Sequence, residues 1–207
     1  ERVHGRVCAM GAVTGRMTHT EPNLANIVAN HKPYGKASRS CWTVPDTNRS
    51  CLVGMDAKGL ELRMLAHYMM DDTFIEEVVN GDPHTYNQKA AGLATRNQAK
   101  TFIYAFLYGA GPAKIGSIVN GTANDGRKLQ EKFLSNLPNL ARLSRAVQSK
   151  AGRGYIRGLD GRRLWIRSRH AALNTLLQGG GAIVCKQWAI FLKKEIDKRG
   201  LDAILVN

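Results

Sequence analysis

The stretch TRNQAKTFIYAFLY, residues 95–108, carries its apolar side chains at helical spacing. Thr95 is a suitable N-terminal cap, so the pattern predicts a helix from this residue to about Tyr108. One face of this helix would carry Arg96, Lys100, Tyr104 and Tyr108. Two cations one turn apart, followed by aromatic rings, can hold a triphosphate and stack a base or sugar. An ordinary amphipathic helix with a solvated polar face is the alternative interpretation.

Further helices are predicted on both sides of this stretch. Apolar periodicity predicts them over residues 60–70, 123–135, 138–151 and 170–198, and Pro83 marks another helix start. The glycines at 179–181 indicate a close helix contact or a kink. Asp160-Gly161, between two apolar segments, indicates a β-hairpin turn. Much helix with few strands predicts an α+β fold.

Two short strands are predicted as well, and the first ends in a carboxylate. Residues 52–56 have the pattern of a buried strand that ends at Asp56, and residues 203–206 begin another. A carboxylate at such a place can hold Mg²⁺, which prefers oxygen ligands. Glu61 would follow on the first turn of the next helix, close to the same cleft. A strand-end Asp alone is more often a cap, so the assignment depends on the neighbouring motifs.

Positive charge is concentrated in the middle of the chain. The formal net charge is +14, and residues 126–169 hold twelve Lys or Arg but only Glu131 and Asp160 as acids. A basic segment of this kind predicts contact with a phosphate backbone. A solvated basic surface is the alternative. The sequence has no apolar run of 18 residues, so we expect no membrane span.

Cysteine usage and motif content exclude other classes of protein. The four cysteines show neither C-x-x-C pairs nor a zinc-like spacing with histidine, which predicts reduced thiols in a cytosolic protein. No G-x-x-x-x-G-K-[ST] motif is present, so a P-loop nucleotide-binding protein is excluded.

Six motifs carry a family resemblance. In chain order they are residues 14–16 with 22–24, then 56–63, 81–85, 96–109, 159–163 and 171–178. Their order and spacing resemble the DNA polymerase I family (family A), particularly its bacteriophage branch, over nearly the whole chain. The resemblance implies a polymerase palm with a mostly helical fingers subdomain. Residues 1–70 would be the first part of the palm, residues 71–169 the fingers, and residues 170–207 a truncated second part of the palm.

The resemblance also implies the catalytic and nucleotide-binding residues. Asp56, helped by the Ala57 carbonyl, is expected to ligate two Mg²⁺ ions, and Lys100 to donate a proton to the leaving pyrophosphate. The expected nucleotide-binding residues are Glu61, His84, Arg96, Lys100, Tyr104 and Tyr108. Within this set, Glu61 would close the space beside the sugar C2′. Tyr104 would pack on the nucleotide, and Tyr108 would lie where the template base enters.

Five residues are expected by the same resemblance to contact DNA: Arg16, Asn23, His170, Asn174 and Gln178. Arg16, Asn174 and Gln178 would bind minor-groove acceptors, which all Watson–Crick pairs offer in similar places. His170 stands where many relatives have Arg. The expected partners are therefore primer–template DNA and deoxynucleoside triphosphates, without a membrane. An accessory processivity protein is left open.

The chain departs from the family in lacking the Val-His-Asp-Glu element that supplies the second metal-binding Asp. That element is expected after residues 203–206, and a thumb and any proofreading exonuclease are expected upstream. We therefore expect a partial gene product that is inactive alone. A clone bounded by a priming site is favoured over a gene split by an intron or intein.

The expected activity of the full-length protein is DNA-directed DNA synthesis by two-metal nucleotidyl transfer, in the host cytoplasm if a phage encodes it. A basic nucleic-acid-binding module without catalysis is the main alternative. It would explain residues 126–169 but neither Asp56 with Glu61 nor the face that begins at Arg96. A single-subunit RNA polymerase is disfavoured by Glu61 beside Asp56 and by the Tyr108-Gly109 end of the helix.

Overall fold

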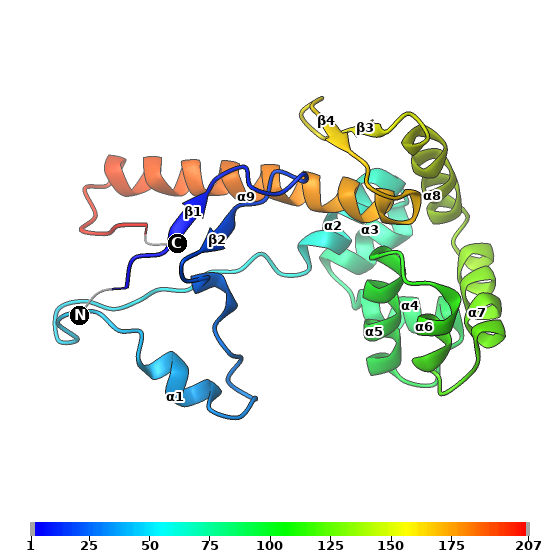
Figure 1. Ribbon diagram of the computed structural model, residues 1–207, viewed down its shortest axis with the longest axis horizontal. Helices are drawn as coiled ribbons and strands as arrows, with labels where there is room; N and C mark the ends of the chain where they lie inside the picture. Colours follow the sequence, from blue (N-terminus) through cyan, green and yellow to red (C-terminus); the bar gives the residue numbers. More distant parts are fainter. Residues whose placement is uncertain (1–2, 206–207) are drawn as a thin grey trace. The chain divides into compact units, whose positions relative to one another are not determined.

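The computed structural model describes residues 3–205, which divide into two units, one up to Lys58 and the other from Gly59 (Figure 1). The first unit is small and mostly exposed. It contains β1 (Arg6–Cys8), β2 (Thr18–Thr20), the 3₁₀ helix η1 (Leu24–Asn26) and α1 (Gly35–Ser40). β1 and β2 are antiparallel, with Val7 opposite His19.

The predicted buried strand over residues 52–56 is wrong. This segment has no regular secondary structure, and Leu52, Val53 and Met55 are 55%, 74% and 56% exposed. A strand requires a neighbour to pair with its backbone N–H and C=O groups. Residues 3–205 form two two-stranded sheets, β1–β2 and β3–β4, and neither includes this segment. Residues 203–205 likewise form no strand, and position 206 lies outside the described residues.

The second unit confirms the predicted helices and is helix-rich, with one small sheet. Its elements are α2 (Leu60–Met69), α3 (Asp72–Val79), α4 (Pro83–Ala91), α5 (Arg96–Leu107), α6 (Pro112–Ser117), α7 (Ala123–Asn136), α8 (Pro138–Ala151), β3 (Tyr155–Arg157), β4 (Arg163–Trp165), η2 (Arg169–Ala171) and α9 (Ala172–Lys198). β3 and β4 are antiparallel, which confirms the predicted hairpin. None of the helices within residues 3–205 is long and apolar enough to cross a membrane.

Local sequence signals explain where these helices begin. Thr95 caps α5 through a reciprocal capping box with Gln98. Thr122 caps α7 through the same arrangement with Asp125. Asp82 caps α4, and Pro83 occupies the first turn, where its missing N–H costs nothing. These signals are local, which is why the helix starts could be predicted from sequence.

The main core lies under the apolar side of α5. Ala99, Phe102 and Ile103 are fully buried, and Leu107 is nearly so. Phe102 meets Phe133 of α7 edge to face, with ring centroids 4.9 Å apart. Figure 1 shows α4, α5, α6 and α7 gathered into one group of helices (green). The buried side of α5 therefore fixes which side faces outward.

The three glycines of α9 are sites of close packing against β4 and α2. A Cβ at Gly179 would come within 2.7 Å of Leu164 Cδ1 in β4, and one at Gly180 within 2.8 Å of Met64 Sδ in α2. Gly181 lies against Leu60, also in α2. Of the two predicted roles, close contact is the one observed. Cys8, Cys41 and Cys51 are exposed and form no disulfide, in agreement with reduced thiols.

Gly126 of α7 is a sharp test of helix packing. An added Cβ would overlap the Pro112 carbonyl oxygen and lie 2.6 Å from the Gly116 amide nitrogen, both backbone atoms of α6. Ala has the higher helix propensity by about 1 kcal/mol. We nevertheless expect Gly126→Ala to lower the free energy of unfolding by a net ~1–2 kcal/mol, because the two helices must move apart.

Urea or thermal unfolding measures this difference. The control is Asn124→Ala, an exposed position on the same helix, which should stay within about 0.5 kcal/mol of the unchanged chain. Equal stability of Gly126→Ala and the unchanged chain would contradict the packing of α6 on α7.

Candidate functional site

The first turn of α5 is joined to the first turn of α4 by an ion pair. Arg96 donates from Nε to Asp82 Oδ2 at 2.6 Å and from a terminal nitrogen to Oδ1 at 2.9 Å. Asp82 also accepts from the Thr85 hydroxyl at 2.6 Å and from the His84 backbone N–H at 3.1 Å. The hydrogen bonds from Arg96, and then from Thr85, hold the pKa of Asp82 well below its usual range. Asp82 therefore stays ionised and aligned on Arg96.

A line of rings continues from this ion pair along the exposed side of α5. The rings of His84 and Tyr104 are 6.2 Å apart, and those of Tyr104 and Tyr108 are stacked at 6.5 Å. Arg96 and Lys100 are exposed, Tyr104 is half-buried, and Tyr108 is 47% exposed. The structure therefore brings together four predicted nucleotide-binding residues of α5 with His84 of α4.

His84 is held as a neutral ring. Burial, and then the positive charge of Arg96, lower the pKa of His84, while Asp82 opposes them. Its Nδ1 is buried and has no hydrogen-bond partner within residues 3–205. The lowered pKa favours the neutral ring, which offers an N–H donor rather than a full positive charge.

Glu61 lies within electrostatic reach of this group. It is half-buried on the first turn of α2, as predicted. Burial, and then the Glu61 carboxylate, raise the pKa of the Tyr104 hydroxyl. A carboxylate from α2 thus acts on the same ring that meets His84.

The far end of α5 meets the start of α9. Gly109 has a left-handed φ of +75°, and an added Cβ would overlap the His170 carbonyl oxygen. His170 is exposed in η2, next to Tyr108-Gly109. Asn174 and Gln178 follow one turn apart on α9, and both are half-buried between fully buried neighbours. Asn174 and Gln178 therefore share one face of α9, and His170 precedes them beside the end of α5.

The other predicted site residues belong to the first unit. Asp56 is exposed and Ala57 half-buried, in the segment without regular structure. Arg16 is exposed in the turn between β1 and β2. Asn23 caps η1, since its side chain accepts from the Ala25 N–H at 3.1 Å. These four residues do not form a cluster comparable to the one on α4 and α5.

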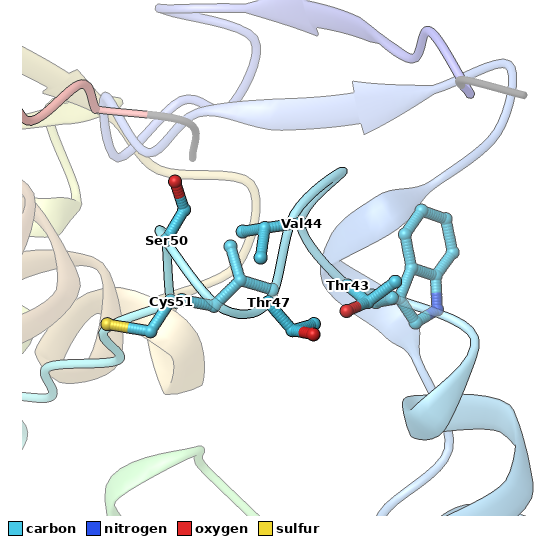
Figure 2. Close-up of a pocket in the computed structure, with 7 residues that line it drawn as sticks. Thr43, Val44, Thr47, Ser50 and Cys51 are labelled. Atoms are coloured by element: carbon cyan, nitrogen blue, oxygen red, sulfur yellow. The ribbon is translucent and has the colours of Figure 1, made fainter.

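The first unit also contains a shallow pocket of about 270 Å³, shown in Figure 2. Hydroxyls of Thr43, Thr47 and Ser50 and the Cys51 thiol line it together with apolar groups. None of the predicted site residues is among its lining residues. Its chemistry offers no charge to a phosphate or a metal ion.

Asp56 and Ala57 are the residues expected at a magnesium site. The Asp56 carboxylate and the Ala57 carbonyl are oxygen donors of the right kind. Within residues 3–205, however, no three His, Cys, Asp or Glu side chains come close enough together to hold a metal ion.

The helix-rich fold is similar to that of a polymerase domain. A solved structure described as the POL domain of Pol1 from M. smegmatis in complex with DNA primer-template and dNTP has a TM-score of 0.83 to this chain. It is 25% identical, and the match covers 100% of this chain and 40% of that one.

The chain belongs to DNA polymerase family A, whose family model matches residues 1–207. It is 45% identical to the DNA-directed DNA polymerases of Enterobacteria phage T3 and Escherichia phage T7, over 97% of this chain and 32% of each relative. DNA polymerase I of Aquifex aeolicus is 28% identical over 100% of this chain and 38% of the length of that enzyme. The chain thus spans about a third of the length of these relatives. The predicted family is confirmed.

Asp82 is the site residue that the sequence prediction missed. Its position before Pro83 at a helix start is a readable capping signal. Its second partner, Arg96, is fourteen positions away on another helix. Only the packing of α4 beside α5 brings the two together.

Two substitutions separate the roles of Asp82. Asp82→Asn keeps a good N-cap but removes the charge that binds Arg96, so we expect only a small loss of stability. Asp82→Ala removes the cap as well and should cost about 1 kcal/mol more in free energy of unfolding.

Urea unfolding at several pH values provides the measurement. Because the folded-state pKa of Asp82 is depressed, its ion pair stabilises above about pH 4 and is lost as the pH falls further. The small advantage of the unchanged chain over Asp82→Asn should therefore shrink below about pH 4. An advantage that grows on acidification would contradict the ion pair.

Proposed function

We propose that this chain is the nucleotide-binding part of a DNA-directed DNA polymerase, in which α5 holds the incoming deoxynucleoside triphosphate. The observation that carries the proposal is the side of α5 on which Arg96, Lys100 and Tyr104 lie together, with His84 beside Tyr104. The 45% identity to the phage T3 and T7 enzymes over 97% of the chain supports it.

Each residue of this group has a task that follows from its chemistry. Arg96 offers a planar fork of donors to phosphate oxygens, and Asp82 holds that fork in a fixed orientation in the free protein. Lys100, one turn along, supplies a flexible cation for the same phosphates and a proton for the leaving pyrophosphate. His84, as a neutral ring, donates an N–H without adding charge.

Tyr104 and Glu61 are proposed to recognise the sugar. Tyr104 offers a half-buried ring on which the nucleotide packs, and Tyr108 continues the stack toward the template base. Glu61, whose charge acts on Tyr104, would close the space beside C2′. A 2′-hydroxyl would then meet the carboxylate or its neighbours, so deoxynucleotides are preferred.

Residues of the first unit and residues of α9 also have proposed roles in the longer protein. Asp56 and the Ala57 carbonyl would hold Mg²⁺ together with a carboxylate from outside these residues. Two bound Mg²⁺ ions would supply activation of the primer hydroxyl and charge neutralisation at the phosphates. Arg16, Asn23, His170, Asn174 and Gln178 would contact primer–template DNA, and the basic segment from Arg127 to Arg169 would attract its backbone.

Primer extension tests the proposal. The 207-residue chain should bind primer–template at low salt but not extend it, because Asp56 alone cannot fix two ions at the spacing of about 3.5–4 Å that the reaction needs. A longer protein with an upstream thumb and a Val-His-Asp-Glu segment should synthesise DNA. Asp56→Asn should abolish that synthesis.

Asp46→Asn is the matched control in the same unit. Its carboxylate accepts from the Asn48 backbone N–H, a bond that Asn also makes, so synthesis should be unchanged. Template-dependent synthesis by the 207-residue chain would contradict the need for a second carboxylate. DNA binding without synthesis by the longer protein would favour the basic nucleic-acid-binding module.

Sugar discrimination is tested in the same longer protein. Removing the carboxylate in Glu61→Ala should raise the ratio of ribonucleotide to deoxynucleotide incorporation by at least roughly tenfold, or ~1.4 kcal/mol. Single-nucleotide incorporation kinetics measure that ratio. Glu131→Ala, an exposed acid on α7, is the control and should leave the ratio unchanged. An unchanged ratio in Glu61→Ala would remove Glu61 from the sugar pocket.

A further inference from the structure

The β3–β4 hairpin has two chemically different faces. Ile156 and Leu164 are register partners, and both are buried in a small core with residues of α8 and α9. The neighbouring pairs, Tyr155 with Trp165 and Arg157 with Arg163, stand on the opposite face. We call these last four residues the hairpin face. Nothing in the proposed nucleotide site uses them.

The hairpin face presents an indole ring to solvent. Trp165 is 58% exposed, although it packs edge to face on Tyr155 with centroids 5.9 Å apart. The guanidinium carbon of Arg163 lies 4.9 Å from the centre of the Tyr155 ring. Tyr155 thus supports the indole of Trp165 and is itself covered by Arg163, while much of the indole surface stays open to solvent. A flat aromatic surface held in this way can stack on a nucleobase.

The charge around this ring is positive. Asp160 is the one acid between residues 155 and 165, and it is paired with Arg162 at 2.6 Å. Arg157 donates to the Gly161 carbonyl at 3.0 Å. Both Arg157 and Arg163 are exposed. Arg153, Arg167 and Arg169 flank the hairpin and are exposed. The surface therefore combines a stacking ring with cations spaced for a phosphate backbone.

We propose that the hairpin face binds single-stranded DNA, with an unpaired base stacked on Trp165 and the adjoining phosphates at Arg157 and Arg163. A base within a duplex is already stacked on both sides and cannot offer its face to the indole. An acidic protein segment would match the charge but would have no need of the exposed ring. The inference rests on the proposed function, in which unpaired template is the strand to be copied.

Fluorescence anisotropy of a labelled oligothymidylate, with the 207-residue chain and without nucleotide or metal, tests the site. Trp165→Ala should weaken binding roughly fivefold or more, whereas Trp165→Phe should keep most of it. Trp188→Ala removes another partly exposed indole, on α9, and should bind like the unchanged chain. Arg163→Gln should reduce the dependence of log affinity on log salt by about 0.7, the value of one phosphate on a single strand.

Three results would overturn the proposal. The first is unchanged oligothymidylate binding by a Trp165→Ala chain whose circular dichroism shows that it is folded. The second is an equal loss for a blunt duplex of the same length, which would mean that the ring does not select unpaired bases. The third is Trp165-dependent binding of polyglutamate without such binding of oligothymidylate. The binding assay uses no nucleoside triphosphate and no metal. A negative result in it is therefore distinct from a failure of primer extension in the longer protein.

Discussion

The edge-to-face contact between Phe102 of α5 and Phe133 of α7 is the packing interaction on which the second unit depends. Phe106 meets the same ring at 5.5 Å, so two successive turns of α5 are held against α7. A helix fixed by its buried side has no freedom to rotate. Arg96, Lys100 and Tyr104 therefore face away from the core because of aromatic packing on the other side of the helix. The orientation of the polar side chains is a consequence of the apolar core.

A polar interaction also orients α4 and α5 relative to each other. Asp82 ends the loop before α4, caps that helix and binds Arg96, so one carboxylate aligns the first turns of two helices. This alignment sets His84 beside Tyr104. The pair Asp82–Arg96 is half-exposed, so its contribution to stability is small. The pair fixes the orientation of the guanidinium, so Arg96 would lose less freedom on meeting a phosphate in the proposed function.

The sequence was sufficient to predict the hairpin and most helices of the second unit, because their signals are local, although it did not predict α3 and α6. Thr95, Pro83 and Asp160-Gly161 each act within a few residues of themselves. The strand at 52–56 was predicted wrongly, since a strand depends on a partner that its own residues do not specify. That Arg96, Lys100 and Tyr104 share one exposed side of α5 could be predicted from the period of one helix, and their role toward a nucleotide stays a proposal. The Asp82–Arg96 pair could not, because it joins two helices whose packing is decided by residues elsewhere.

The contact of Gly109 with the His170 carbonyl has a thermodynamic consequence. The end of α5 cannot shift far without displacing η2, because no side chain lies between the two backbones to absorb the movement. The helix proposed to hold the nucleotide is thus coupled mechanically to the helix that carries Asn174 and Gln178. If nucleotide restricts the motion of α5 and DNA restricts the motion of α9, the binding of one affects the binding of the other. The factor by which DNA changes nucleotide affinity must then equal the factor by which nucleotide changes DNA affinity. A single glycine backbone would thus carry a reciprocal coupling between substrate and template.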